Sequence, residues 1–117
     1  MIKKGTTEDF FQNKEIFHMR DNDNGEIQTI NIKDLKEVFF VKDFQGNPKY
    51  QDRDDKIRLG LGKKIRVKFK DGEMLVGYTQ GFSRDRVGFI MFPSDPISNN
   101  DKVFVVTAAT INVSFVQ

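Results

Sequence analysis

The chain has 117 residues, which is enough for one compact domain or two very small ones. Hydrophobic residues make up 38% and charged residues 31%, and the net charge is only +2, which excludes a strongly basic nucleic-acid-wrapping protein and an acidic tail. The absence of Cys and a single His exclude disulfides, thiolate or His-rich metal sites and a thiol nucleophile. No apolar run reaches the roughly 18 residues of a membrane span, and no signal peptide opens the chain. We therefore expect a soluble cytoplasmic protein with no metal, cofactor or membrane partner.

The first part of the chain alternates apolar and polar residues with a period of two, which predicts β-strands. The predicted strands cover residues 3–11, 15–19, 26–32 and 37–41. A polar, irregular stretch over 44–61 follows and is the one credible linker. We therefore expect a first unit over 1–43, a linker over 44–61 and a second unit over 62–117.

The second part repeats this pattern and begins with its clearest strand. Ile65, Val67 and Phe69 share one face of that strand, and basic residues share the other. Asp71-Gly72 forms a hairpin turn that leads into the next strand. The predicted strands cover residues 63–69, 73–82, 87–92, 102–107 and 110–116. Five short consecutive strands predict a small antiparallel barrel or meander.

The two parts match each other at fixed offsets, which predicts an internal repeat. At an offset of 72 the identical pairs are Gly5 and Gly77, Thr7 and Thr79, Phe10 and Phe82, Phe17 and Phe89, and Met19 and Met91. After an insertion in the loop 93–101 the offset becomes 75, and it pairs Val38 with Val113, Phe40 with Phe115 and Val41 with Val116. The strand 63–70 would map before Met1, so the first copy is expected to lack its first strand.

The second copy resembles the Sm-like small β-barrel family. The resemblance rests on the strand that ends in Asp71-Gly72, on Gly77 in the next strand and on Phe82 in the loop that follows. Asp85 is displaced from the family's pattern, and residues 106–110 replace its second signature. The resemblance implies two tandem Sm-like or SH3-like small antiparallel barrels. The segment 34–41, which reads DLKEVFFV, is also similar to bacterial proteins of unknown function.

A basic stripe is the first candidate site, and it would bind nucleic acid. The stripe consists of Lys64, Arg66, Lys68 and Lys70. Such a row could neutralise several phosphates. The favoured interpretation is nevertheless the solvent face of an amphipathic strand whose lysines discourage edge pairing. In Sm-like proteins the loop after Phe82 meets a nucleobase, so the resemblance extends the candidate site to Arg84 and Arg86.

Other residues point to a protein contact or to no chemistry. Phe10 and Phe39 are the candidate interface residues, because exposed Phe often marks a contact between proteins. His18 has Ile90 as its repeat partner and is interpreted as non-catalytic, because no Ser-His-Asp pattern accompanies it. We therefore expect no catalytic residues and no enzymatic activity.

The sequence thus predicts a non-enzymatic protein-interaction or assembly module. An RNA- or nucleotide-binding small β-barrel is the alternative, and a PilZ-type cyclic-dinucleotide receptor is its less favoured variant, because the arginine pair and the Asp-x-Ser-x-x-Gly motif of that family are missing. The missing first strand should leave an open sheet edge beside Phe10, Phe39 and Phe40. A homodimer through that edge is the expected assembly, and a further protein partner is compatible with it.

Overall fold

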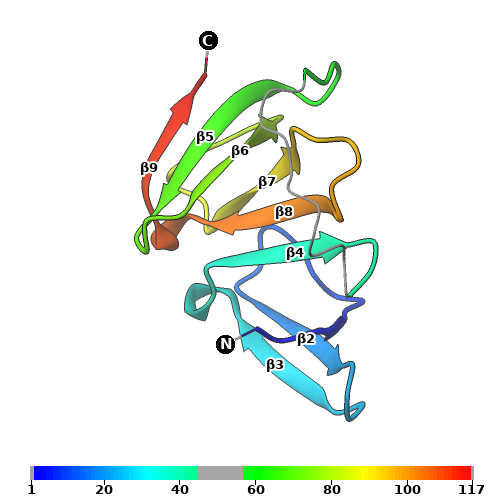
Figure 1. Ribbon diagram of the computed structural model, residues 1–117. Coiled ribbons are helices and arrows are strands. Elements are labelled where there is room, and N and C mark those ends of the chain that lie inside the picture. The colour runs from blue at the N-terminus through cyan, green and yellow to red at the C-terminus, as the bar shows by residue number, and fades with distance from the viewer. Residues whose placement is uncertain (1, 45–56, 117) are drawn as a thin grey trace.

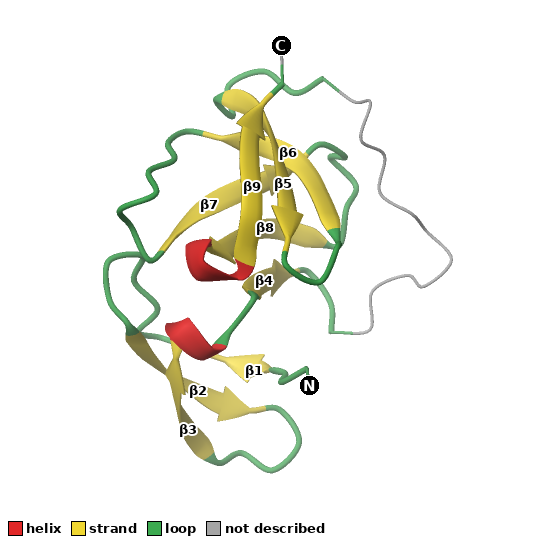
Figure 2. Cartoon of the chain, turned by 90° about the vertical axis from the view of Figure 1, so that its left-hand side faces the viewer, coloured by secondary structure: helices red, strands yellow, loops and turns green. Residues whose placement is uncertain are grey.

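The computed structural model describes residues 2–44 and 57–116, and the predicted linker lies mostly outside the described residues. Short β-strands and two single 3₁₀ turns make up the regular structure, as Figures 1 and 2 show from two sides. The elements are β1 (Gly5–Thr6), β2 (Ile16–Asp21), β3 (Ile27–Asn31), η1 (Ile32–Asp34), β4 (Glu37–Val41), β5 (Lys63–Phe69), β6 (Met74–Thr79), β7 (Gly88–Pro93), β8 (Asn100–Val106), η2 (Thr107–Ala109) and β9 (Thr110–Phe115). The prediction of an all-β fold is confirmed.

The strands form two antiparallel sheets. One has three strands in the order β1-β2-β3, and the other has six in the order β4-β8-β7-β6-β5-β9. The larger sheet curves strongly, so that β5 and β9 lie across from β7 and β8 (Figures 1 and 2). Its end strands β4 and β9 do not pair with each other; β4 pairs with β8, and β9 pairs with β5. The described strands therefore do not close into the two expected barrels.

The side chains of the large sheet pack on both of its faces and form two hydrophobic cores. Core 1 lies inside the curve of the large sheet and consists of Ile65, Val67, Phe69, Phe89, Met91, Val103, Val105 and Val113. Core 2 lies between the two sheets and consists of Phe17, Met19, Ile30, Ile32, Phe104 and Val106. Because successive side chains of a strand point to opposite faces, β8 contributes Val103 and Val105 to core 1 and Phe104 and Val106 to core 2.

The pairing of β4 with β8 joins the two predicted units. β4 belongs to residues 1–43 and β8 to residues 62–117, and Val38 of β4 lies opposite Phe104 of β8. The face formed by β7 and β8 covers core 2, where the first unit lacks a strand of its own. The second unit therefore covers the core of the first. The strands that would flank the missing first strand, β1 and β4, each pair with one neighbour only among the described strands.

The strand registers of the two units coincide at the offsets read from the sequence. Gly5 pairs with Asp21 and Gly77 with Pro93, at an offset of 72 for both residues. Phe17 pairs with Ile30 in the first unit. Phe89, at an offset of 72 from Phe17, pairs with Val105, at an offset of 75 from Ile30. The two 3₁₀ turns begin at residues 32 and 107, an offset of 75. At both Gly5 and Gly77 a Cβ atom would collide with the carbonyl oxygen of the neighbouring strand, Arg20 or Phe92, which explains the glycines.

The core aromatic residues follow the same offset. The rings of Phe10 and Phe17 meet edge to face with centroids 5.1 Å apart, and those of Phe82 and Phe89 do so at 4.8 Å. Phe10 also contacts the rings of Phe40 and Phe104, at 5.2 and 5.1 Å. The loop between β1 and β2 therefore inserts Phe10 into core 2, which is why the strand predicted over 3–11 is shortened to β1.

Candidate interaction edges

Four strands end the two sheets, and two of them expose large apolar side chains most strongly. β3 pairs only with β2, and β9 pairs only with β5, among the described strands. Ile27 at the start of β3 is 63% exposed, and Phe115 at the end of β9 is 53% exposed. Neither residue was among the candidates from the sequence, because an alternating pattern does not reveal which strands end a sheet.

The backbone of these two strands has hydrogen-bonding groups directed away from their single partners. The N–H of Ile32 donates to the carbonyl oxygen of Glu15, and the N–H of Val116 donates to that of Lys64. Successive residues of a strand direct their backbone groups to opposite edges. Thr29 and Ile27 of β3 therefore face the open edge, as do Val113 and Phe115 of β9. These groups form a ready template for another strand.

Lys64, Arg66 and Lys68 of the basic stripe lie on the solvent side of β5, and Lys70 follows in the turn to β6. Ile65, Val67 and Phe69 are fully buried, and the side chains between them point the other way. β5 is an inner strand between β6 and β9, so its lysines do not protect a sheet edge as the sequence had suggested. The residues opposite Arg66 are Val76 and Ser114, and the residues opposite Lys68 are Met74 and Asn112. The stripe is therefore one strand wide and has no basic neighbours across the strands.

Arg84 and Arg86 lie in the exposed connection between β6 and β7. The guanidinium of Arg84 lies over the ring of Phe82 at 5.8 Å, and the N–H of Arg86 donates to the carbonyl oxygen of Ser83. Phe82 itself packs against core 1. This loop holds its arginines at the surface, but the ring beside them packs against core 1. The loop therefore offers no free aromatic ring on which a base could stack.

The two predicted interface residues have different environments. Phe10 is half-buried and lies among three rings of core 2, so its ring is used in the fold and is not free for a partner. Phe39 is 46% exposed and lies in β4 opposite Val103. Phe39 thus has the exposure expected of an interface residue, and Phe10 does not.

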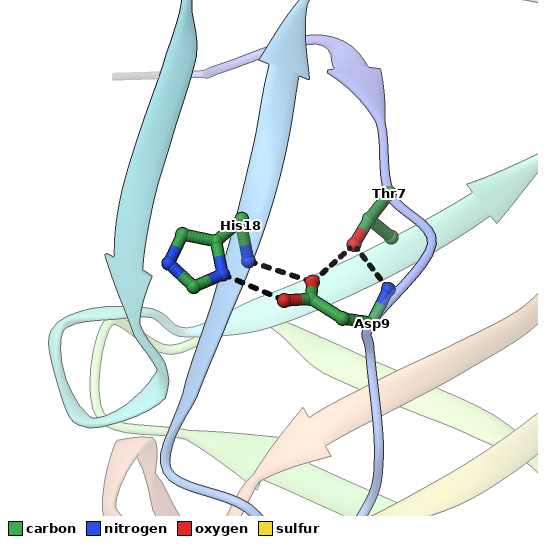
Figure 3. A network of polar contacts seen from close by, with 3 residues as sticks. All are labelled: Thr7, Asp9 and His18. Atoms are coloured by element: carbon green, nitrogen blue, oxygen red, sulfur yellow. Dashed lines mark hydrogen bonds and ion pairs between the residues drawn. The ribbon is translucent and has the colours of Figure 1, made fainter.

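His18 has an acidic partner that the sequence did not reveal. Its Nδ1 lies 2.6 Å from Asp9 Oδ2, and its backbone N–H donates to Asp9 Oδ1 at 2.8 Å. The Thr7 hydroxyl donates to the same Oδ1 at 3.1 Å, as Figure 3 shows. The hydrogen bonds from His18 lower the pKa of Asp9 to about 2. The hydroxyl in this network bonds to Asp9 and not to the ring, so the network anchors the Phe10 loop to β2 and presents no activated nucleophile.

A second charged cluster links β4 to the turn between β5 and β6. Lys36 Nζ lies 2.8 Å from Asp71 Oδ2 and 2.6 Å from Glu73 Oε2, and it sits 4.7 Å from the centre of the Phe69 ring. The Glu37 side chain beside it is only 6% exposed, and its Oε2 has no hydrogen-bond partner. Burial and the carboxylates of Glu73 and Asp71 raise the pKa of Glu37 to about 7, although Lys36 opposes them. This cluster fastens the two units together.

An open hollow near β1 is lined by Ile2, Lys3, Lys4, Asp21, Asn22, Asp23, Gln28, Asp43 and Phe44. No group of three or more His, Asp or Glu side chains in the described part of the chain could hold a metal ion. In the same part, no helix is both long and apolar enough to cross a membrane.

Comparison with known families places the whole chain in one of them. A family of unknown function, DUF6982, matches residues 1–117. The chain belongs to the DUF6982 family. No curated protein and no solved structure matches the chain. Membership of DUF6982 assigns no activity, so the function must be argued from the sheets and their edges.

Proposed function

We propose that this member of DUF6982 is a non-enzymatic assembly module that self-associates through open β-sheet edges. The observation that carries the proposal is the presence of two open-edge strands, β3 and β9, with Ile27 and Phe115 exposed on them. Proteins usually protect such edges with charges, prolines or bulges, or they use them for pairing. The smallest assembly of this kind is a homodimer. We also propose that the protein is bacterial and acts in the cytoplasm.

We further propose that the two units are diverged copies of one Sm-like unit. The matching registers of Gly5 and Gly77, the matching Phe10–Phe17 and Phe82–Phe89 ring pairs and the matching 3₁₀ turns support this proposal. The order β9-β5-β6-β7-β8 in the second unit also fits a five-strand unit in which the last strand pairs with the first.

The edge that the proposal uses differs from the one that the sequence suggested. The missing first strand was expected to leave an open edge beside Phe10, Phe39 and Phe40. β4 pairs with β8 on one side and has no partner on its other side among the described strands, but Phe10 and Phe40 pack against core 2. We base self-association on the edges of β3 and β9, because Ile27 and Phe115 are more exposed than Phe39. A further protein partner that adds a strand to either edge belongs to the same class of function.

Nucleic-acid binding remains the second-ranked function. The basic stripe is a single row on an inner strand, and no aromatic side chain alternates with its members. Phosphate contacts from such a row would be weak and strongly dependent on salt. Catalysis ranks below both, because the described side chains give the His18 ring no hydroxyl within hydrogen-bond distance.

Self-association is tested by light scattering of the purified protein over a wide range of concentrations. We expect the mass to rise above the 13.6 kDa of one chain as concentration increases. The rise should persist after nuclease treatment and in high salt, because strand pairing depends on backbone hydrogen bonds and apolar contacts. A mass of one chain at every concentration would contradict the proposed function. An association lost with nuclease would favour the nucleic-acid alternative.

A further inference from the structure

The junction between β4 and β8 is a strand pairing between the two units within one chain. Its register places Glu37 opposite Val105, Val38 opposite Phe104, Phe39 opposite Val103 and Phe40 opposite Lys102. The N–H of Val106 donates to the carbonyl oxygen of Lys36 at 3.1 Å. The pairs of Val38 with Phe104 and of Phe40 with Lys102 are therefore the hydrogen-bonded ones, because these pairs alternate along an antiparallel ladder.

Applying the repeat offset to the β4–β8 junction gives an equivalent pairing between β9 and β3. Adding 75 to residues 37–40 of β4 gives residues 112–115 of β9, and subtracting 75 from residues 102–106 of β8 gives residues 27–31 of β3. The pair of Phe40 and Lys102 becomes Phe115 and Ile27, and the pair of Val38 and Phe104 becomes Val113 and Thr29. In one chain, β3 and β9 end different sheets and lie at opposite ends of the molecule (Figures 1 and 2). Two chains are therefore needed to bring the residues of each converted pair together.

Two independent features of β3 and β9 agree with the converted register. First, the backbone groups of Ile27, Thr29, Val113 and Phe115 face the open edges, as hydrogen-bonded pairs require. Second, the register places Phe115 directly opposite Ile27, and these are two of the most exposed large apolar side chains on any described strand. A cross-strand contact between Phe115 and Ile27 would bury apolar surface of both side chains.

We propose that β9 of one copy pairs antiparallel with β3 of a second copy, with Phe115 opposite Ile27 and Val113 opposite Thr29. The inference rests on the proposed function and names its partner as another copy of this chain. The contact uses different surfaces on the two copies, so the first copy keeps a free β3 edge and the second a free β9 edge for further neighbours. Assembly therefore proceeds head to tail and not through a two-fold axis.

The outer faces of the two units set the strength of this contact. Ile90, Phe104 and Val106 of β7 and β8 pack against core 2 and make the internal junction apolar. The residues at the corresponding positions of β2 and β3 are His18, Thr29 and Asn31, which are exposed and polar. The contact between copies therefore consists of the strand ladder and the Phe115–Ile27 pair. It is weaker than the internal junction and depends on concentration.

Blocking one edge at a time provides the test. Ile27→Glu should disable the β3 edge, and Phe115→Glu the β9 edge, because each places a carboxylate opposite an apolar side chain. A Lys is not used, because Lys102 lies over the Phe40 ring at the equivalent place of the internal junction and is accommodated there. Both sites are more than half exposed, so the fold should persist, and circular dichroism verifies it. Ile97→Glu is the matched control, since Ile97 is 67% exposed in the loop between β7 and β8. Light scattering then measures the mass of each variant and of equal mixtures.

The inference predicts that each edge variant alone has the mass of one chain and that their mixture has the mass of two. In the mixture, the intact β9 of Ile27→Glu pairs with the intact β3 of Phe115→Glu, and growth stops there. The control should assemble like the wild type. If Ile27→Glu alone still forms dimers, the contact is two-fold, and the inference is wrong while the proposed function stands. If both variants assemble like the wild type, the inference is also wrong. A monomeric wild type would contradict the proposed function itself.

Discussion

Glu37 offers the most direct test of how the two units are held together. Its side chain is 6% exposed, its Oε2 lacks a partner, and the carboxylates of Glu73 and Asp71 lie close by. Burial, together with these carboxylates, raises the pKa of Glu37 from its ordinary value of 4.5 to about 7 in the folded protein. The folded protein therefore binds a proton that the unfolded chain releases between these two pH values.

The sign and size of the effect follow from this difference. Because the folded state holds the extra proton, the free energy of unfolding falls as pH rises from about 4.5 to about 7 and stays low above that range. A difference of this size corresponds to about 3 kcal/mol, since one pKa unit is worth about 1.4 kcal/mol. Glu37→Gln cannot ionise, so it should be more stable than the wild type by up to about 3 kcal/mol at pH 8 and nearly equal to it at pH 4.

The measurement is urea unfolding followed by circular dichroism at several pH values between 4 and 8. Glu37→Met is a second variant, because an apolar side chain of similar size leaves no polar atom buried without a partner. Glu26→Gln, at an exposed carboxylate in the turn between β2 and β3, is the matched control and should follow the wild type. If Glu37→Gln and the wild type change in parallel across this pH range, the argument from burial is refuted.

Three further predictions concern the core, the His18 network and the basic stripe. Phe104→Ala should destabilise the protein by about 3–5 kcal/mol in one unfolding transition, because Phe104 is fully buried in the strand that serves both cores; two separate transitions would show that the units unfold independently. Asp9→Asn should remove the part of the acid sensitivity that arises as pH falls from about 4 to about 2, because the depressed pKa of Asp9 stabilises the fold only while that carboxyl is ionised; acid titration by circular dichroism measures it. Replacing the three stripe residues within β5 by Glu should leave folding intact, and neither variant nor wild type should bind RNA at physiological salt; tight, salt-sensitive binding by the wild type in a filter assay would reverse our ranking of functions.

The strands themselves could be predicted from the sequence, because the period of two and the Asp71-Gly72 turn are local signals. The pairing of β4 with β8 could not, because it joins residues far apart in the chain and no local pattern records it. One signal was nevertheless present. Residues 103–106 read Val-Phe-Val-Val, a continuous apolar run that is typical of a strand buried on both faces and not of one with a solvent side.

The candidate sites divide in the same way. The basic stripe lies on the solvent side of its strand as the alternation predicts, but the sequence could not tell that β5 is an inner strand. Phe10 was assigned to an interface because it was expected to lie beside the open edge left by the missing first strand. Its three ring neighbours come from β2, β4 and β8. The partnership of Asp9 with His18 depends on how the loop between β1 and β2 folds back, which no motif encodes.

The place of β8 between the two cores also governs the order in which the chain can fold as it is synthesised. Multi-unit proteins commonly complete their N-terminal unit first. Here core 2 holds residues of β2 and β3 but also Phe104 and Val106, so it cannot close until that late segment has been made. Until synthesis reaches residue 106, Phe17, Met19 and Ile30 therefore lack the cover of Phe104 and Val106. Folding then finishes both cores together, through contacts of long sequence separation that slow the final step.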